Sequence, residues 1–182
     1  MKKQEKMDII SSAMINQELC RCYFTYDENY YYYYVNAVND AFILGQEEDD
    51  FLLNGYCIRK LSQLKKVEIK DDKCNAINKL LGVIDQIQMP DVDITSWQTI
   101  FNSLKVWNGF VIVEDDCNGQ FAIGKIEKVL KTKIYLKAFD ADGIWSEENL
   151  EIPYSTITSV KWGTRYAKAW EWYLEKGMIM EA

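Results

Sequence analysis

An internal repeat constrains the fold of this 182-residue chain more than any other feature of its sequence. Residues 8–19 align without gaps on residues 93–104, and residues 61–81 align in the same way on residues 154–174. The identical pairs are Asp8/Asp93, Ile9/Ile94, Ser11/Ser96, Ile15/Ile100 and Leu19/Leu104 in the first block, and Ser62/Ser155, Val67/Val160, Ala76/Ala169 and Leu81/Leu174 in the second. Ordinary residue usage would give roughly one identity per block by chance. Because the two blocks also keep their order, we interpret the chain as a duplicated unit.

The repeat predicts two domains, at residues 1–85 and 91–182, joined around residues 82–90. Domains of this size bury a modest share of their surface and are marginally stable alone. We therefore expect the other copy, the flanking helices or an oligomer to supply further core contacts. With 48% hydrophobic and 14% aromatic residues, the chain has enough apolar material for globular cores.

Charge and cysteine content limit the classes of partner and compartment. The net charge is −7, with −3 in residues 1–90 and −4 in residues 91–182, so neither half offers a broad phosphate-binding surface, although a local basic loop stays possible. The five cysteines form no Cys-x-x-Cys pair and the chain has no histidine, which counts against a zinc site. We expect reduced thiols in a cytoplasmic protein. No apolar run reaches membrane-spanning length, so we expect no membrane contact.

Hydrophobic periodicity and turn residues predict the same series of elements in each copy. In the first copy we expect a helix at 7–20, strands at 22–26, 30–38, 41–45, 51–58 and 64–70, and a helix at 73–81. In the second copy we expect a helix capped by Asp93 or Thr95, strands at 110–114, 120–129, 132–139, 144–152 and 157–162, and a helix at 165–175. Residues 46–50 take the place of the Asp- and Gly-rich turn at 140–143. Each unit is thus a helix, five short antiparallel strands and a helix.

Residues 121–126, 134–136 and 152–160 carry a resemblance to a known class of fold. With their order of elements, they resemble the Sm-like and SH3-like small barrels, in which a helix precedes a strongly bent five-stranded sheet. Gly124 stands where such a strand must bend hard, which glycine permits. The two halves together resemble most closely uncharacterised bacterial proteins that carry two such copies. The resemblance implies a mainly β fold with flanking helices, built as two tandem five-stranded small barrels, each preceded and followed by a helix.

The chain departs from the Sm pattern in two places. Tyr33 occupies the first-copy position that corresponds to Gly124, and the terminal Ile/Leu-Arg-Gly signature of the Sm family is missing. The RNA-contacting residues of that family therefore correspond to no position in this chain.

The tyrosine run at residues 30–34 is the first candidate site. Consecutive strand residues alternate between the two faces of a sheet, so about half of these rings should point inward. We favour a strand whose inward rings fill the core, because tyrosine is a common strand residue. If exposed, Tyr30, Tyr32 and Tyr34 would form one stripe, which would contact a protein before it contacts RNA.

Aromatic residues also crowd the last helix. Tyr166, Trp170 and Tyr173 recur at spacings of four and three, so they are predicted to lie on one helical face that packs in the core or between domains. Trp172 lies off that stripe and is a candidate anchor for a partner.

Two acidic segments and several lysines allow simpler interpretations. Residues 47–50, and residues 140–143 with Glu147 and Glu148, could in principle bind a divalent cation. The second segment resembles part of a calcium loop but lacks the third acidic ligand and the closing glutamate at the proper spacing. Solvated turns are favoured, and we expect no metal and no cofactor. The lysines are Lys65, Lys66, Lys125, Lys128, Lys131, Lys133 and Lys137. They alternate with apolar residues, as on the solvated face of a strand.

The motif content favours a binding role over catalysis. Without histidine the commonest general base is missing, and no GxSxG, P-loop or GxGxxG motif occurs. We predict a non-enzymatic module that binds or scaffolds another protein or associates with itself. The alternative is RNA binding by analogy with Sm-like proteins, and a small hydrolase or metal-dependent enzyme is a third hypothesis.

Overall fold

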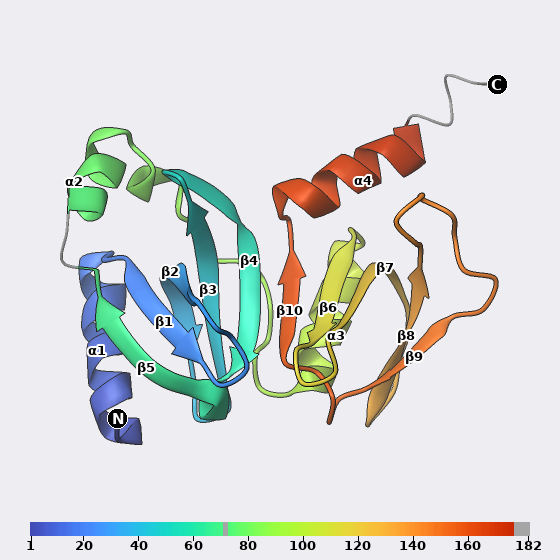
Figure 1. Cartoon of the computed structure of the whole chain (residues 1–182), viewed down its shortest axis with the longest axis horizontal. Helices are drawn as coiled ribbons and strands as arrows, with labels where there is room; N and C mark the ends of the chain where they lie inside the picture. Colours follow the sequence, from blue (N-terminus) through green and yellow to red (C-terminus); the bar gives the residue numbers. More distant parts are fainter. Residues whose placement is uncertain (71–72, 177–182) are drawn as a thin grey trace. The chain divides into compact units, whose positions relative to one another are not determined.

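Antiparallel strands account for most of the regular structure in a computed structural model that describes residues 1–70 and 73–176. The chain divides into two units, Met1–Pro90 and Asp91–Ala182. Each described unit has one five-stranded antiparallel sheet and helices, and Figure 1 shows both sheets strongly bent. The prediction of a mainly β fold with flanking helices is therefore confirmed.

In the first unit one helix precedes a bent sheet and a second helix follows it along the chain. Its elements are α1 (Lys3–Asn16), β1 (Cys20–Phe24), β2 (Tyr30–Val38), β3 (Phe42–Asp49), β4 (Leu52–Lys60), the 3-10 turn η1 (Leu61–Gln63), β5 (Leu64–Ile69), α2 (Lys73–Leu80) and the 3-10 turn η2 (Ile84–Gln86). The strands lie in the order β5-β1-β2-β3-β4, and α1 packs on β2 and β5. Alternate residues of β1 point inward and join Ile10 and Ala13 of α1 in the core.

The second unit repeats this order. Its elements are α3 (Trp97–Trp107), β6 (Val111–Asp115), β7 (Gln120–Val129), β8 (Lys133–Ala138), β9 (Leu150–Pro153), β10 (Ser159–Trp162) and α4 (Arg165–Lys176). The strands lie in the order β10-β6-β7-β8-β9, so the last strand of each unit pairs with the first. The helix α3 packs on β7, and α4 joins a core of Phe110, Phe139 and their neighbours.

Both sheets are open. Within the described parts of the units, no strand pairing joins β4 to β5 or β9 to β10, so closed barrels are not observed. None of the described helices has both the length and the apolar character needed to cross a membrane.

The helices that open the two units differ from the prediction, and the first begins at Lys3 instead of residue 7. The first helix ends at Asn16 instead of residue 20, because Gln17 adopts a left-handed conformation (φ 51°) and closes the helix with a hydrogen bond to the carbonyl of Ala13. The second-copy helix is capped by Ser96 and not by Asp93 or Thr95. The Ser96 hydroxyl accepts a 3.1 Å hydrogen bond from the Thr99 amide.

Two strand predictions also need correction. The strand expected at 144–152 is shorter, because only Leu150–Pro153 is regular and Trp145 turns inward onto the rings of Phe110 and Phe139. In the first unit β3 runs to Asp49, so the turn between β3 and β4 lies at residues 50–51 and not at 46–50.

Strand pairing shows which matched positions are equivalent. Val67 lies opposite Cys22 and Val160 lies opposite Val113, so the second matched block occupies the same place in both units. The first block does not, because Leu19 follows the end of α1 whereas Leu104 lies inside α3. The register of both second strands shifts at corresponding places, between Val35 and Ala37 and between Ile126 and Lys128.

Tyr33 and Gly124 do occupy equivalent places. Tyr33 pairs with Cys20, the first residue of β1, and Gly124 pairs with Val111, the first residue of β6. In the first unit the small residue lies on the neighbouring strand: a Cβ atom at Gly45 would stand 2.8 Å from the Cβ of Tyr33. The bulk of Tyr33 is therefore accommodated by a glycine on β3.

Candidate functional site

The tyrosine run alternates between the two faces of β2, as its strand periodicity predicts. Tyr31 and Tyr33 face the interior with their rings stacked, and Tyr33 is buried. The Tyr33 hydroxyl donates a 3.3 Å hydrogen bond to Glu47, and burial raises its pKa well above the usual value. The Tyr31 hydroxyl donates to Asp27 at 3.4 Å. These two rings are core residues.

Tyr34 is not the partner contact that the stripe of Tyr30, Tyr32 and Tyr34 suggested. Its side chain is buried, and its hydroxyl accepts a 2.9 Å hydrogen bond from the amide of Asn78 on α2. Burial raises the pKa of Tyr34 to about 12. The exposed part of the stripe therefore ends at Tyr32, because the helix after β5 supports the Tyr34 ring.

Tyr30 and Tyr32 lie beside cationic side chains. The Arg21 guanidinium stands 4.7 Å from the centre of the Tyr30 ring and donates a 3.3 Å hydrogen bond to the Tyr32 hydroxyl. The Lys70 amine lies 3.8 Å from the centre of the Tyr32 ring. Burial acts to raise the pKa of Tyr32, but hydrogen bonds from Lys70, Tyr30 and Arg21 hold it below its usual value.

The carboxylate of Glu68 contacts three side chains of this group. Glu68 accepts hydrogen bonds from Arg21 (3.2 Å) and the Tyr23 hydroxyl (3.0 Å) and forms an ion pair with Lys66. Hydrogen bonding to Lys66 lowers the pKa of Glu68. The tyrosine–cation face comprises Arg21, Tyr23, Tyr30, Tyr32, Lys66, Glu68 and Lys70. Arg21 and Lys70 contact tyrosine rings of this face, and Lys66 forms an ion pair with Glu68.

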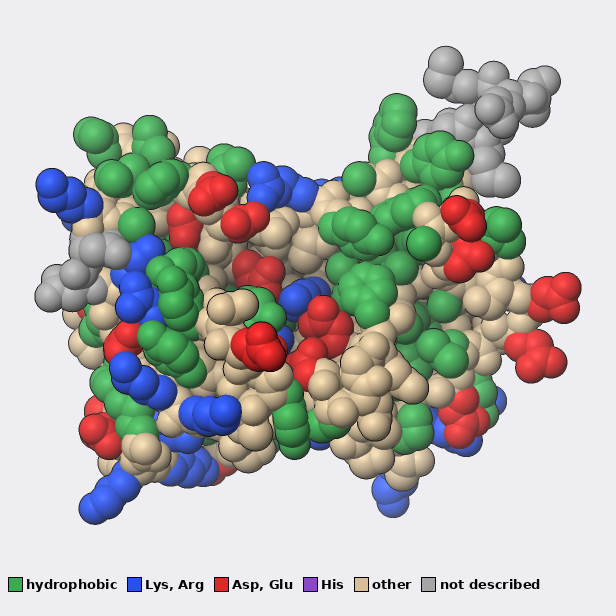
Figure 2. All heavy atoms as spheres, in the orientation of Figure 1, with side chains coloured by type: hydrophobic (Ala, Val, Ile, Leu, Met, Phe, Trp, Pro, Cys, Tyr) green, Lys and Arg blue, Asp and Glu red, His purple; other side chains and the backbone are tan. Residues whose placement is uncertain are grey.

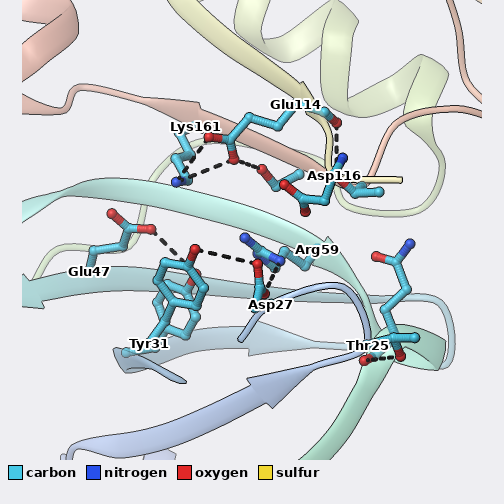
Figure 3. Close-up of polar contacts among 12 residues, drawn as sticks. Thr25, Asp27, Tyr31, Glu47, Arg59, Glu114, Asp116 and Lys161 are labelled. Atoms are coloured by element: carbon cyan, nitrogen blue, oxygen red, sulfur yellow. Dashed lines mark hydrogen bonds and ion pairs between the residues drawn. The ribbon is translucent and has the colours of Figure 1, made fainter. Parts of the chain in front are cut away.

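A buried ion pair lies behind β2, and the sequence analysis missed it. Asp27, in the turn between β1 and β2, contacts Arg59 of β4 at 2.7 Å (Figure 3). The guanidinium also lies 4.6 Å from the Phe24 ring centre and 4.8 Å from that of Tyr31. The only signal for this pair was an arginine among the apolar residues of a strand. Because the pair is buried and joins the β1–β2 turn to β4, we assign it a structural role in holding that turn against the sheet.

The helix α4 exposes rings that were expected in the core. Tyr166 is 51% exposed and Tyr173 is 55% exposed, so neither lies in the core of the second unit, and their packing between domains stays a prediction. Only Trp170 of that stripe enters the core, where its ring lies 5.2 Å from that of Phe139. The small side chain of Ala167 and the tip of Leu174 fill the rest of the contact, which leaves the tyrosines outside.

These rings form a continuous exposed surface, which we call the α4 aromatic surface. It comprises the exposed rings of Phe121, Tyr166 and Tyr173 and the half-buried ring of Trp170. Ring contacts link Phe121 to Tyr166 (6.1 Å), Tyr166 to Trp170 (6.4 Å) and Trp170 to Tyr173 (5.9 Å). Trp172 is 60% exposed on the same helix, but it lies two residues from Trp170 and therefore outside this surface. Figure 2 shows hydrophobic side chains gathered over α4 and next to it.

A cavity of about 440 Å³ also lies in the second unit, between the β6–β7 turn and β9. Glu114 lines it, but this carboxylate accepts hydrogen bonds from Ser159 and Lys161, the latter contact visible in Figure 3. Asp115 also lines it, and its carboxylate accepts from the amides of Cys117 and Asn118 in its own turn. The acidic groups of the cavity thus serve the local fold.

The acidic segment at 140–143 is built as a turn. The Asp140 carboxylate accepts hydrogen bonds from the amides of Asp142 (3.0 Å) and Ile144 (2.9 Å). Within residues 1–70 and 73–176, no three Cys, Asp or Glu side chains gather into a group that could hold a metal ion. Comparisons with protein-family models, with curated proteins and with solved structures gave no match. The function must therefore be inferred from the surfaces themselves.

Proposed function

We propose that this chain is a non-enzymatic protein-binding or scaffold module, and that its α4 aromatic surface contacts the partner. The main supporting observation is that the exposed rings of Phe121, Tyr166 and Tyr173 are connected through ring contacts with Trp170. Tyrosine and tryptophan supply most of the binding energy at protein interfaces, because they bury large areas at low entropic cost. A contiguous exposed aromatic surface is uncommon on a protein that stays alone.

We also propose that the two units are tandem small barrels of Sm-like or SH3-like type that arose by duplication. Three observations support this proposal: the strand order is the same in both units, the second strands shift register at corresponding places, and the matched block at 61–81 and 154–174 falls on equivalent elements. The resemblance to Sm-like and SH3-like small barrels rests on this order of elements, in which a helix precedes a bent five-stranded sheet.

The protein-binding proposal is tested by the double variant Tyr166→Ser/Tyr173→Ser, which removes two exposed rings of the surface. We expect affinity capture from the native host, quantified by mass spectrometry, to lose its specific partner by at least about tenfold. Val106→Ser is the matched control, because Val106 is also exposed in the second unit but lies on α3, outside the surface. Retention of every partner by the double variant would refute the proposal.

RNA binding is the second candidate, and the tyrosine–cation face favours it. The exposed ring of Tyr30 and the half-buried ring of Tyr32 lie next to Arg21 and Lys70, which combines stacking surfaces with positive charge, as in single-strand binders. The faces of Tyr30 and Tyr32 are already in contact with Arg21 and Lys70, so a base would have to displace these cations. We therefore rank RNA binding below protein binding.

A further inference from the structure

The α4 aromatic surface borders a strongly acidic loop. The connection between β8 and β9 reaches α4 at Gly143, where an added Cβ would stand 3.0 Å from the Trp170 ring and 3.3 Å from Leu174. Residues 140–149 contain four carboxylates and no lysine or arginine. These carboxylates belong to Asp140, Asp142, Glu147 and Glu148, and all four residues are exposed. Figure 2 shows acidic side chains in the region of this loop.

Few nearby cations offset this charge. The Lys137 amine donates to the backbone carbonyls of Ser146 (2.7 Å) and Glu147 (3.4 Å), and Lys125 forms an ion pair with Glu175 of α4. Arg165 and Lys168 are exposed on α4, one residue before and two residues after Tyr166, and residues at these spacings do not share a helical face. The loop therefore presents a negative rim beside an apolar surface.

The negative charge of this loop favours some classes of binding partner over others. Phosphate groups of a nucleic acid or of an anionic lipid would meet four carboxylates at close range, which opposes binding. A protein segment with lysine or arginine beside large apolar side chains gains both apolar burial and charge attraction. We infer that the α4 aromatic surface binds a basic amphipathic segment of another protein. This inference rests on the proposed function and adds the charge of the partner.

Model peptides test the inference on the full chain. The probes are a fluorescent amphipathic helical peptide of leucine and lysine, its leucine–glutamate counterpart, and a serine–lysine peptide without apolar anchors. The rim variant is Asp142→Asn/Glu147→Gln/Glu148→Gln, which keeps Asp140 because its carboxylate holds the turn. The control is Glu28→Gln/Asp85→Asn/Asp91→Asn, which removes the same charge from exposed positions elsewhere. Binding is followed by fluorescence anisotropy at two salt concentrations.

We expect the leucine–lysine peptide to bind at least about tenfold more tightly than either other peptide. The rim variant should weaken that binding several-fold and reduce its salt dependence, whereas the control should not. Equal binding of the leucine–lysine and leucine–glutamate peptides would overturn the inference while the proposed function stands. Binding that survives Tyr166→Ser/Tyr173→Ser would count against the surface itself. A dimer of this chain that the double variant dissociates would make a second copy the occupant and also overturn the inference.

Discussion

Arg59 carries its charge into the interior of the first unit, with 2% of its side chain exposed. A buried charge is tolerated when an opposite charge and suitable rings surround it, and Asp27, Phe24 and Tyr31 provide these. An exposed ion pair differs, because water already solvates both groups. The chain contains such a pair between Lys3 and Asp40, also at 2.7 Å. The two pairs have equal distances but differ in burial and in the rings that surround Arg59.

Replacement of each carboxylate should therefore have unequal effects on stability. We expect Asp27→Asn to lower the free energy of unfolding by about 3 kcal/mol, because it leaves the Arg59 charge without the carboxylate at 2.7 Å. Asp40→Asn should cause no measurable loss. Urea denaturation followed by circular dichroism measures both. Equal stability of the two variants would show that the buried pair is not a structural requirement.

Strand pairing in the second unit depends on a close approach between β7 and β8. A Cβ at Gly124 would lie 1.9 Å from the carbonyl oxygen of Lys137, so no side chain fits without a backbone shift. The first unit has the corresponding small residue on β3, where Gly45 faces Tyr33. Either strand of the pair can supply the small residue, provided that one of them does.

The variant Gly124→Ala should consequently destabilise the protein by about 3 kcal/mol. Gly119→Ala is the matched control in the same unit, because no atom lies within 4 Å of its added Cβ. Its positive φ of 62° should cost about 1 kcal/mol. Thermal unfolding of both variants measures the difference. A loss for Gly124→Ala no larger than for the control would mean that β7 and β8 can separate freely.

At the scale of the whole molecule, the net charge of −7 opposes binding of polyanions. We expect short labelled RNA and DNA oligonucleotides to bind with a Kd weaker than about 100 μM at about 150 mM salt. Fluorescence anisotropy at low and moderate salt measures this. Tighter binding that Lys66→Ala/Lys70→Ala weakens would move RNA recognition ahead of protein binding.

The order of elements was largely predictable from the sequence. Turn residues and apolar periodicity are local signals, and they located all ten strands, although several ends shifted and β9 proved much shorter than expected. Exposure was less predictable, as Tyr34 and Tyr166 show. Alternation correctly separated Tyr30 and Tyr32 from Tyr31 and Tyr33, but it could not show that α2 supports Tyr34 or that α4 packs through Ala167 and Leu174.

The sequence by itself determined a β-rich chain with a helix, five strands and a helix in each half, because these features depend on neighbours along the chain. Only the tertiary structure decided which rings reach the surface, where Arg59 finds its carboxylate and which matched block is structurally equivalent. Each of these depends on residues distant in sequence that meet when helices pack on a sheet, such as Asn78 with Tyr34 or Gly143 with Trp170. Packing between distant segments leaves no periodic signal in the sequence, so the candidate surface on α4 emerged only with the fold.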